Sequence, residues 1–149
     1  MKRFLVATDG SPAARAAVEA AVELAAEQDA AITFLHVLPE VDIVVPAFGP
    51  VVAAPHRQPA TDEDEALTHA AAVAEEHGVP HTLRLATGVD RDVIVDTADL
   101  IGADLVALGS NRHGVLGTAF LGSVSRDVLR RTTLPVLIVH PTERAAAAA

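Results

Sequence analysis

The sequence predicts an α/β fold: a single doubly wound domain in which helices cover both faces of a five-stranded parallel sheet. Short apolar runs alternate along the chain with longer segments of helical periodicity, as in βαβ units. Most of these runs are nearly continuous in Val, Ile and Leu, as expected of strands covered on both faces. A chain of 149 residues, half of them apolar, has the size of one compact domain with a sizeable core.

The strands are expected at residues 4–8, 31–37, about 81–86, 104–109 and 136–140. Ser11 can cap the first helix, with Pro12 in the first turn, where a missing amide proton does no harm. The second helix is expected to begin at Thr61 and run to residues 77–78, because a hydroxyl and several carboxylates lie at its positive end. The third is expected over about 91–101, and the fourth from near Ser123 to before Thr133.

Residues 39–60 interrupt this alternation. The segment carries five prolines and is too long for a typical connection between a strand and a helix. It predicts either a lid or a disordered insertion within a domain that spans residues 1–144. The alanine-rich residues 145–149 are expected to fray.

Composition excludes several classes of function. The formal net charge of −9 offers no broad attraction for nucleic acid or anionic membranes, and the chain has no cysteine for disulfides or thiolate chemistry. No segment is long and apolar enough for a secretory signal or a membrane span. These features predict a cytoplasmic protein with neither nucleic acid nor a membrane as a partner.

In an open parallel sheet, ligands bind beyond the carboxyl ends of the strands. Asp9 follows the first strand, where it could bind adenosine, hold a magnesium ion that contacts phosphate, or only form the turn. Gly109 ends the fourth strand, and Gly122 precedes a helix whose free amides suit a polyphosphate. The alternative is that Ser123 only caps this helix. His36 and His140 are expected to pack at strand ends.

Motifs for other chemistries are missing from the sequence. It contains neither the Gly-x-x-x-x-Gly-Lys-Ser/Thr loop nor the Gly-x-Gly-x-x-Gly turn of dinucleotide-binding enzymes. No serine stands in a Gly-x-Ser-x-Gly elbow, and no histidines have the spacing of a metal site. Dedicated hydrolytic chemistry therefore has little support.

Five segments of the chain, residues 6–11, 35–37, 103–110, 121–125 and 134–139, resemble the universal stress protein family. The resemblance covers essentially the whole chain except the proline-rich segment and the tail. It implies the strand order 3-2-1-4-5, a crevice between the first and fourth strands, and a homodimer formed through the last strand. That strand, from Val136 to His140, is apolar, and its unpaired edge would otherwise stay exposed.

The resemblance also implies a glycine pattern around bound ATP. ADP and AMP stay open as the nucleotide, and the Mg²⁺ role of Asp9, as an indirect ligand, is an interpretation from the residues alone. The first glycine matches Gly109, the closing pair matches Gly122 and Ser123, and Arg112 stands at the middle glycine, where its guanidinium could pair with phosphate. The implied contacts fall into three groups: Ala7, Thr8 and Asp9 at the adenosine, Val37 at the base with Leu108 near the base or ribose, and Ser123, Val124 and Ser125 at the phosphates. Gly114, beside Arg112, is expected to give the loop conformational freedom.

The leading hypothesis is a dimeric regulatory protein of the stress response that binds ATP and acts as a switch rather than as a fast enzyme. The first alternative is a nucleotide-free dimeric interaction module, for which Arg112 is the best support. The second is a slow ATPase, which rests on Asp9 and a metal alone.

Overall fold

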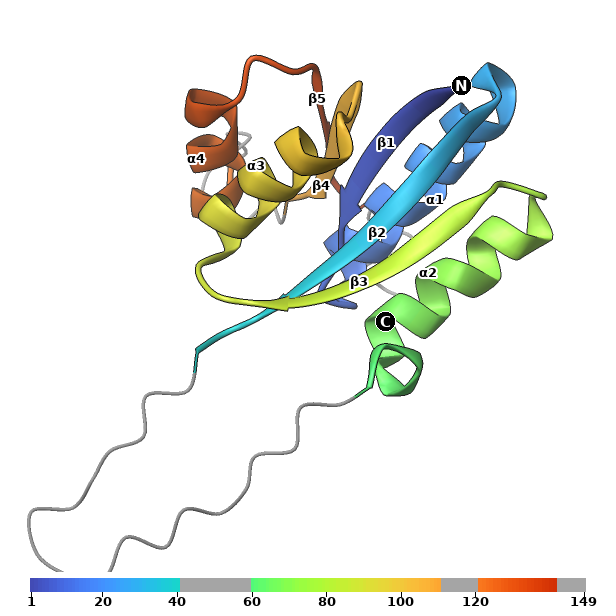
Figure 1. Ribbon diagram of the computed structural model, residues 1–149, viewed down its shortest axis with the longest axis horizontal. Coiled ribbons are helices and arrows are strands. Elements are labelled where there is room, and N and C mark those ends of the chain that lie inside the picture. Colours follow the sequence, from blue (N-terminus) through green and yellow to red (C-terminus); the bar gives the residue numbers. More distant parts are fainter. Residues whose placement is uncertain (41–59, 111–120, 142–149) are drawn as a thin grey trace, which may run out of the picture.

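The computed structural model describes residues 1–40, 60–110 and 121–141, and these form the expected α/β architecture (Figure 1). In the described ranges all four strand pairings are parallel, and the sheet has the order β3-β2-β1-β4-β5 that the family resemblance implies. The strands are β1 Lys2–Ala7, β2 Ala30–Leu38, β3 His81–Thr87, β4 Leu105–Gly109 and β5 Val136–Val139. The central β1 has β2 on one side and β4 on the other, so the strand order reverses there.

Two helices cover each face of the sheet (Figure 1). The helices are α1 Pro12–Gln28 and α2 Glu65–Glu76 on one face, and α3 Asp90–Ile101 and α4 Ser123–Arg131 on the other. The cap predicted for α1 is confirmed, since the Ser11 hydroxyl accepts a hydrogen bond from Ala14 N–H at 3.3 Å and Pro12 is the first helical residue. A left-handed Gly102 ends α3, as its position in the sequence predicts.

The alternation of side chains along each strand divides the interior into two cores. Phe4 and Val6 of β1 point toward α1 and α2, whereas Leu5 between them points toward α3 and α4. These three side chains are at most 2% exposed. Because the central strand is apolar on both faces, it can be buried only between two layers of helices.

The expected start of the second helix is wrong. Residues Thr61–Glu63 form a short 3₁₀ turn, and α2 begins at Glu65, four residues later than predicted, with Asp64 as its N-cap. The carboxylate of Asp64 accepts the N–H of Leu67 at 3.0 Å and also contacts His36, so it caps the helix and fixes its position against β2. Thr61 offers only a hydroxyl, and it has no such partner on the sheet.

The predicted lid or insertion at 39–60 lies outside the described residues except at its two ends, and the alanine-rich tail lies wholly outside them. In the described ranges, no helix has the length and apolar character needed to cross a membrane.

Replacing Asp64 should therefore cost more stability than replacing Thr61. We expect Asp64→Ala to lower the free energy of unfolding by about 2 kcal/mol, since it removes both the helix cap and the hydrogen bond to His36. Thr61→Ala is the matched control and should change it by less than about 0.5 kcal/mol. Urea unfolding followed by circular dichroism measures both, and equal losses would contradict the assignment of Asp64 as the cap.

Candidate functional site

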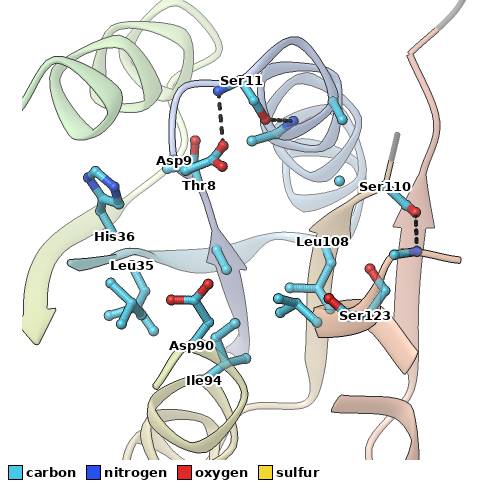
Figure 2. Close-up of a pocket in the computed structure, with 18 of the residues that line it drawn as sticks. Thr8, Asp9, Ser11, Leu35, His36, Asp90, Ile94, Leu108, Ser110 and Ser123 are labelled. Atoms are coloured by element: carbon cyan, nitrogen blue, oxygen red, sulfur yellow. Dashed lines mark hydrogen bonds between the residues drawn. The ribbon is translucent and has the colours of Figure 1, made fainter. Parts of the chain in front are cut away.

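A pocket of about 550 Å³ opens at the carboxyl ends of the strands, where the strand order reverses (Figure 2). Its wall comes from the ends of β1, β2 and β4 and from the starts of α1, α3 and α4. The structure brings together ten residues of the predicted site: Ala7, Thr8, Asp9, Val37, Leu108, Gly109, Gly122, Ser123, Val124 and Ser125. Arg112 and Gly114, the other two predicted site residues, lie outside the described residues.

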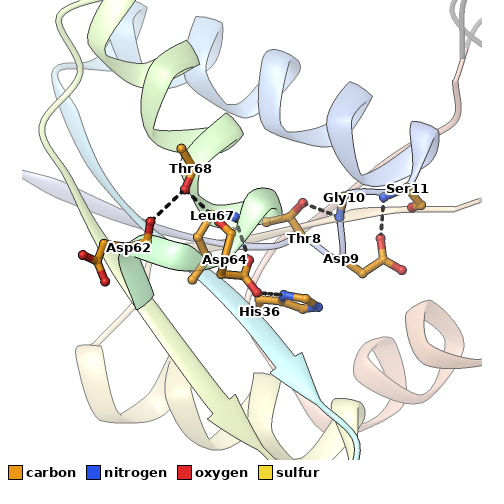
Figure 3. A network of polar contacts seen from close by, with 9 residues as sticks. All are labelled: Thr8, Asp9, Gly10, Ser11, His36, Asp62, Asp64, Leu67 and Thr68. Atoms are coloured by element: carbon orange, nitrogen blue, oxygen red, sulfur yellow. Dashed lines mark hydrogen bonds and ion pairs between the residues drawn. The ribbon is translucent and has the colours of Figure 1, made fainter. Parts of the chain in front are cut away.

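The segment after β1 is a tight turn held by its own side chains. Thr8 is 3% exposed, and its N–H donates to the Leu35 carbonyl at 2.9 Å while its hydroxyl accepts the N–H of Gly10 at 3.3 Å. The Asp9 carboxylate accepts the N–H of Ser11 at 2.9 Å (Figure 3). The alternative role of Asp9 as a turn residue is thus confirmed, and its exposed carboxylate also faces the pocket.

The backbone of Val37 faces the pocket because β1 ends before β2 does. The Leu35 carbonyl points toward β1, where it accepts from Thr8, and the Leu38 carbonyl points the other way, to Gly88 N–H near β3. Since backbone groups alternate in direction along a parallel strand, the N–H and carbonyl of Val37 point to the β1 side. β1 pairs no further along β2 than Leu35, so these two groups are available to a ligand.

Gly109 is required by the packing of the chain itself. A Cβ atom at this position would lie 2.3 Å from the carbonyl carbon and oxygen of Ala13 and 2.5 Å from the amide nitrogen of Ala14. The first turn of α1 therefore lies directly on the end of β4. This contact closes the floor of the pocket between the two strands.

At the start of α4, backbone amides that have no acceptor among the described residues face the pocket. Gly122 is the N-cap, no side chain caps the helix, and Ser123 is its first residue, so the alternative that Ser123 is the cap is wrong. The hydroxyl of Ser110 accepts the Gly122 N–H at 3.0 Å (Figure 2). The following amides, of Ser123 to Ser125, belong to the first turn, which has no acceptor within the helix.

Gly122 differs from Gly109 in what surrounds it. Its φ is −58°, which any residue adopts, and the nearest heavy atom to an added Cβ would be the Ser110 hydroxyl oxygen at 3.6 Å. Residues 1–40, 60–110 and 121–141 therefore leave room for a side chain at this position. The space beside Gly122 borders the backbone amides of Ser123 to Ser125 at the start of α4. A bound anion would need such a space next to amide donors.

Charge is divided across the pocket. Asp9 lines it from the turn after β1 and Asp90 from the start of α3. Arg126 lines it from α4, where its guanidinium also donates to the Leu121 carbonyl at 3.2 Å. Together with the positive end of α4, Arg126 makes that side favourable for phosphate. Among the described residues, no group of three or more His, Cys, Asp or Glu side chains could hold a metal ion.

The pocket residues that the sequence analysis did not assign to the site include three polar ones near strand ends, Ser110, Asp90 and His36. Ser110 follows Gly109 and holds the two glycine segments together, Asp90 starts α3, and His36 lies on β2. Their common signal is a position at, or just beyond, the carboxyl end of a parallel strand.

His36 and His140 do lie near strand ends as expected, and Nδ1 of His140 donates to the Ser110 carbonyl at 2.8 Å.

Comparison with known proteins gives a consistent result. Residues 1–140 match the family model of the universal stress protein family. A universal stress protein of Bacillus subtilis is 35% identical over 145 residues, which cover 93% of this chain and 98% of that protein. A universal stress protein structure from Archaeoglobus fulgidus superposes with a TM-score of 0.71 at 24% identity, covering 93% of this chain and 98% of that one. Another, of a universal stress protein in complex with cAMP, has a TM-score of 0.69 and 26% identity, covering 95% and 98%.

The two glycines of the pocket should respond differently to the same substitution. We expect Gly109→Ala to lower the free energy of unfolding by about 3 kcal/mol, because the new methyl group overlaps the backbone of α1. Gly122→Ala should cost less than about 1 kcal/mol, the usual difference between glycine and alanine at an N-cap. Thermal or urea unfolding of both variants tests this, and similar losses would contradict the distinction.

Proposed function

The chain belongs to the universal stress protein family, and from this premise we propose that it binds an adenine nucleotide in the pocket and acts as a regulatory protein of the stress response. The observation that carries the proposal is the uncapped start of α4 beside Gly122. It combines amide donors that have no acceptor in the described part of the chain, the positive end of a helix, and a space that the described residues leave open. This is a site for phosphate.

The rest of the pocket fits a nucleoside that extends away from this phosphate site. The backbone N–H and carbonyl of Val37 offer one hydrogen-bond donor and one acceptor on the same side of β2. This pair suits the edge of an adenine base, which carries an acceptor next to a donor. Leu108 and Ile94 supply apolar surface beside it, and Asp9 lies at the ribose, with a further role as an indirect ligand of Mg²⁺. The related structure in complex with cAMP supports an adenine nucleotide as the ligand.

We propose ATP as the preferred nucleotide, with Ser123, Val124 and Ser125 at its phosphates. From the family resemblance, Arg112 and Gly114 complete the loop around them. We expect binding to act as a switch that changes which surface the protein presents, and fast turnover is not expected. Among the described residues that line the pocket, no nucleophilic side chain is hydrogen-bonded to a general base.

Titration calorimetry of nucleotide-free protein with ATP and Mg²⁺, with AMP and with GTP tests the proposal. We expect micromolar binding of ATP and much weaker binding of GTP. Gly122→Val should weaken ATP binding by at least about tenfold, since its side chain fills the space at the helix amides. Leu129→Ala, on the exposed side of α4 and outside the pocket, is the control and should bind as the wild type does.

Two other results would replace this function. Absence of binding heat and of thermal stabilisation with every nucleotide would favour the nucleotide-free interaction module. Steady-state phosphate release that disappears in Asp9→Ala would favour the slow ATPase.

We also propose a homodimer through the last strand. β5 is at the edge of the sheet, and its four residues are each partly exposed. Pro135 and Val139 direct their carbonyls to Val106 and Ser110, so Ile138 directs its own N–H and carbonyl to the open edge. An apolar strand with free backbone groups is a template for pairing with a second copy.

The substitution Ile138→Pro separates dimer formation from folding. It removes the outward N–H, while the bonds between β4 and β5, which involve the neighbouring residues, remain. We expect the wild type to sediment as a dimer at micromolar concentration and the variant as a folded monomer in analytical ultracentrifugation. A wild-type monomer, or a dimer unaffected by the substitution, would overturn this interface.

A further inference from the structure

A histidine and a buried aspartate form a pair on the β2 side of the pocket. The His36 side chain lines the pocket and is 16% exposed, and that of Asp64 is 7% exposed. Nδ1 of His36 lies 2.8 Å from Oδ2 of Asp64 (Figure 3). Asp64 is also the N-cap of α2, so the pair holds the imidazole between a strand and a helix in a defined orientation.

The partners of Asp64 determine which ring nitrogen carries the proton. An ionised carboxylate only accepts hydrogen bonds, and Oδ1 of Asp64 already accepts the N–H of Leu67. The contact with His36 therefore needs the proton on Nδ1. In the neutral imidazole this leaves Nε2 as an acceptor, and Figure 3 shows that edge of the ring pointing away from Asp64, on the side of Asp9.

The base of a bound nucleotide would lie next to Nε2 of His36. The amides of α4 and Arg126 favour phosphates on the α4 side of the pocket, while the carboxylates of Asp9 and Asp90 disfavour them on the other. The base then extends toward β2. There the free backbone groups of Val37 lie next in sequence to His36, so one edge of the base faces both residues.

Resting on the adenine-nucleotide site proposed above, we propose that His36 determines base specificity: its Nε2 accepts a hydrogen bond from the 6-amino group of a purine. A 6-oxo purine places an acceptor at the same point, so two lone pairs would face each other and the base would be rejected. Asp64 is a positioning residue, because it acts on the base only by holding the proton on Nδ1.

The substitution Asp64→Asn reverses this polarity without removing the cap. Asparagine is as good an N-cap as aspartate, and its carbonyl oxygen can keep the bond to Leu67 N–H. Its amide group then donates to Nδ1 of His36. The ring proton must move to Nε2, which changes from an acceptor into a donor that suits a 6-oxo purine.

The test is titration calorimetry of the full chain with two matched pairs of ligands, ATP with ITP and AMP with IMP. The wild type should prefer the amino purine in each pair. Asp64→Asn should lower that preference by at least about tenfold, since one favourable hydrogen bond becomes a repulsive contact and the reverse holds for the oxo purine. His36→Leu, which removes the acceptor, should lower the preference without creating one for the oxo purine.

Asp62→Asn is the matched control. It removes the same charge two residues earlier, on an exposed side chain, and should leave the preference unchanged. Folded Asp64→Asn and His36→Leu proteins that bind ATP with the wild-type preference would overturn the role of His36 while leaving the proposed function intact. A wild type that binds no adenine nucleotide would overturn both.

Discussion

The close approach of α1 to the end of β4 is the constraint on which the pocket depends. Only a residue without a Cβ fits at position 109, because the backbone of Ala13 lies directly against it. This contact brings the turn after β1 next to the segment after β4, although a hundred residues separate them in sequence. The pocket floor, the exposed Asp9 carboxylate and the placement of Ser110 opposite Gly122 all follow from that contact.

The remaining wall of the pocket follows from unequal strand lengths. Because β2 extends beyond the point where β1 turns at Thr8, two backbone groups of Val37 remain without a strand beside them. If β1 and β2 ended at the same level, these backbone groups would be paired between the two strands. The same overhang places His36 within reach of Asp64 at the start of α2, so the specificity proposed for the base and the available backbone groups have one origin.

The strands, most helix boundaries and the two-faced core were predictable because they depend on local pattern, whereas the strand order came from the family resemblance. Continuous apolar runs such as residues 4–6 must be covered on both faces, and the signals at Ser11 and Gly102 mark helix ends directly. The start of α2 was not predictable in this way. Thr61 and Asp64 are both acceptable caps by sequence, and the choice depends on His36, which lies 28 residues before Asp64. The ten predicted residues that line the pocket lie at strand ends, just beyond them or at a helix start, and local pattern marks these positions. Ser110 was not predicted, because its place in the pocket depends on its bond to Gly122.

Ser110 also joins two parts of the molecule that the proposed function treats separately. Its hydroxyl holds the amide at the start of α4, and its backbone bonds to β5 through both the Val139 carbonyl and the His140 ring. A ligand at α4 and a second subunit along β5 would therefore act on the same residue from opposite sides. Linkage between two such equilibria is reciprocal, so any strengthening of assembly by the ligand requires an equal strengthening of ligand affinity by assembly. The fraction of protein with bound nucleotide would then depend on the protein concentration as well as on the nucleotide concentration.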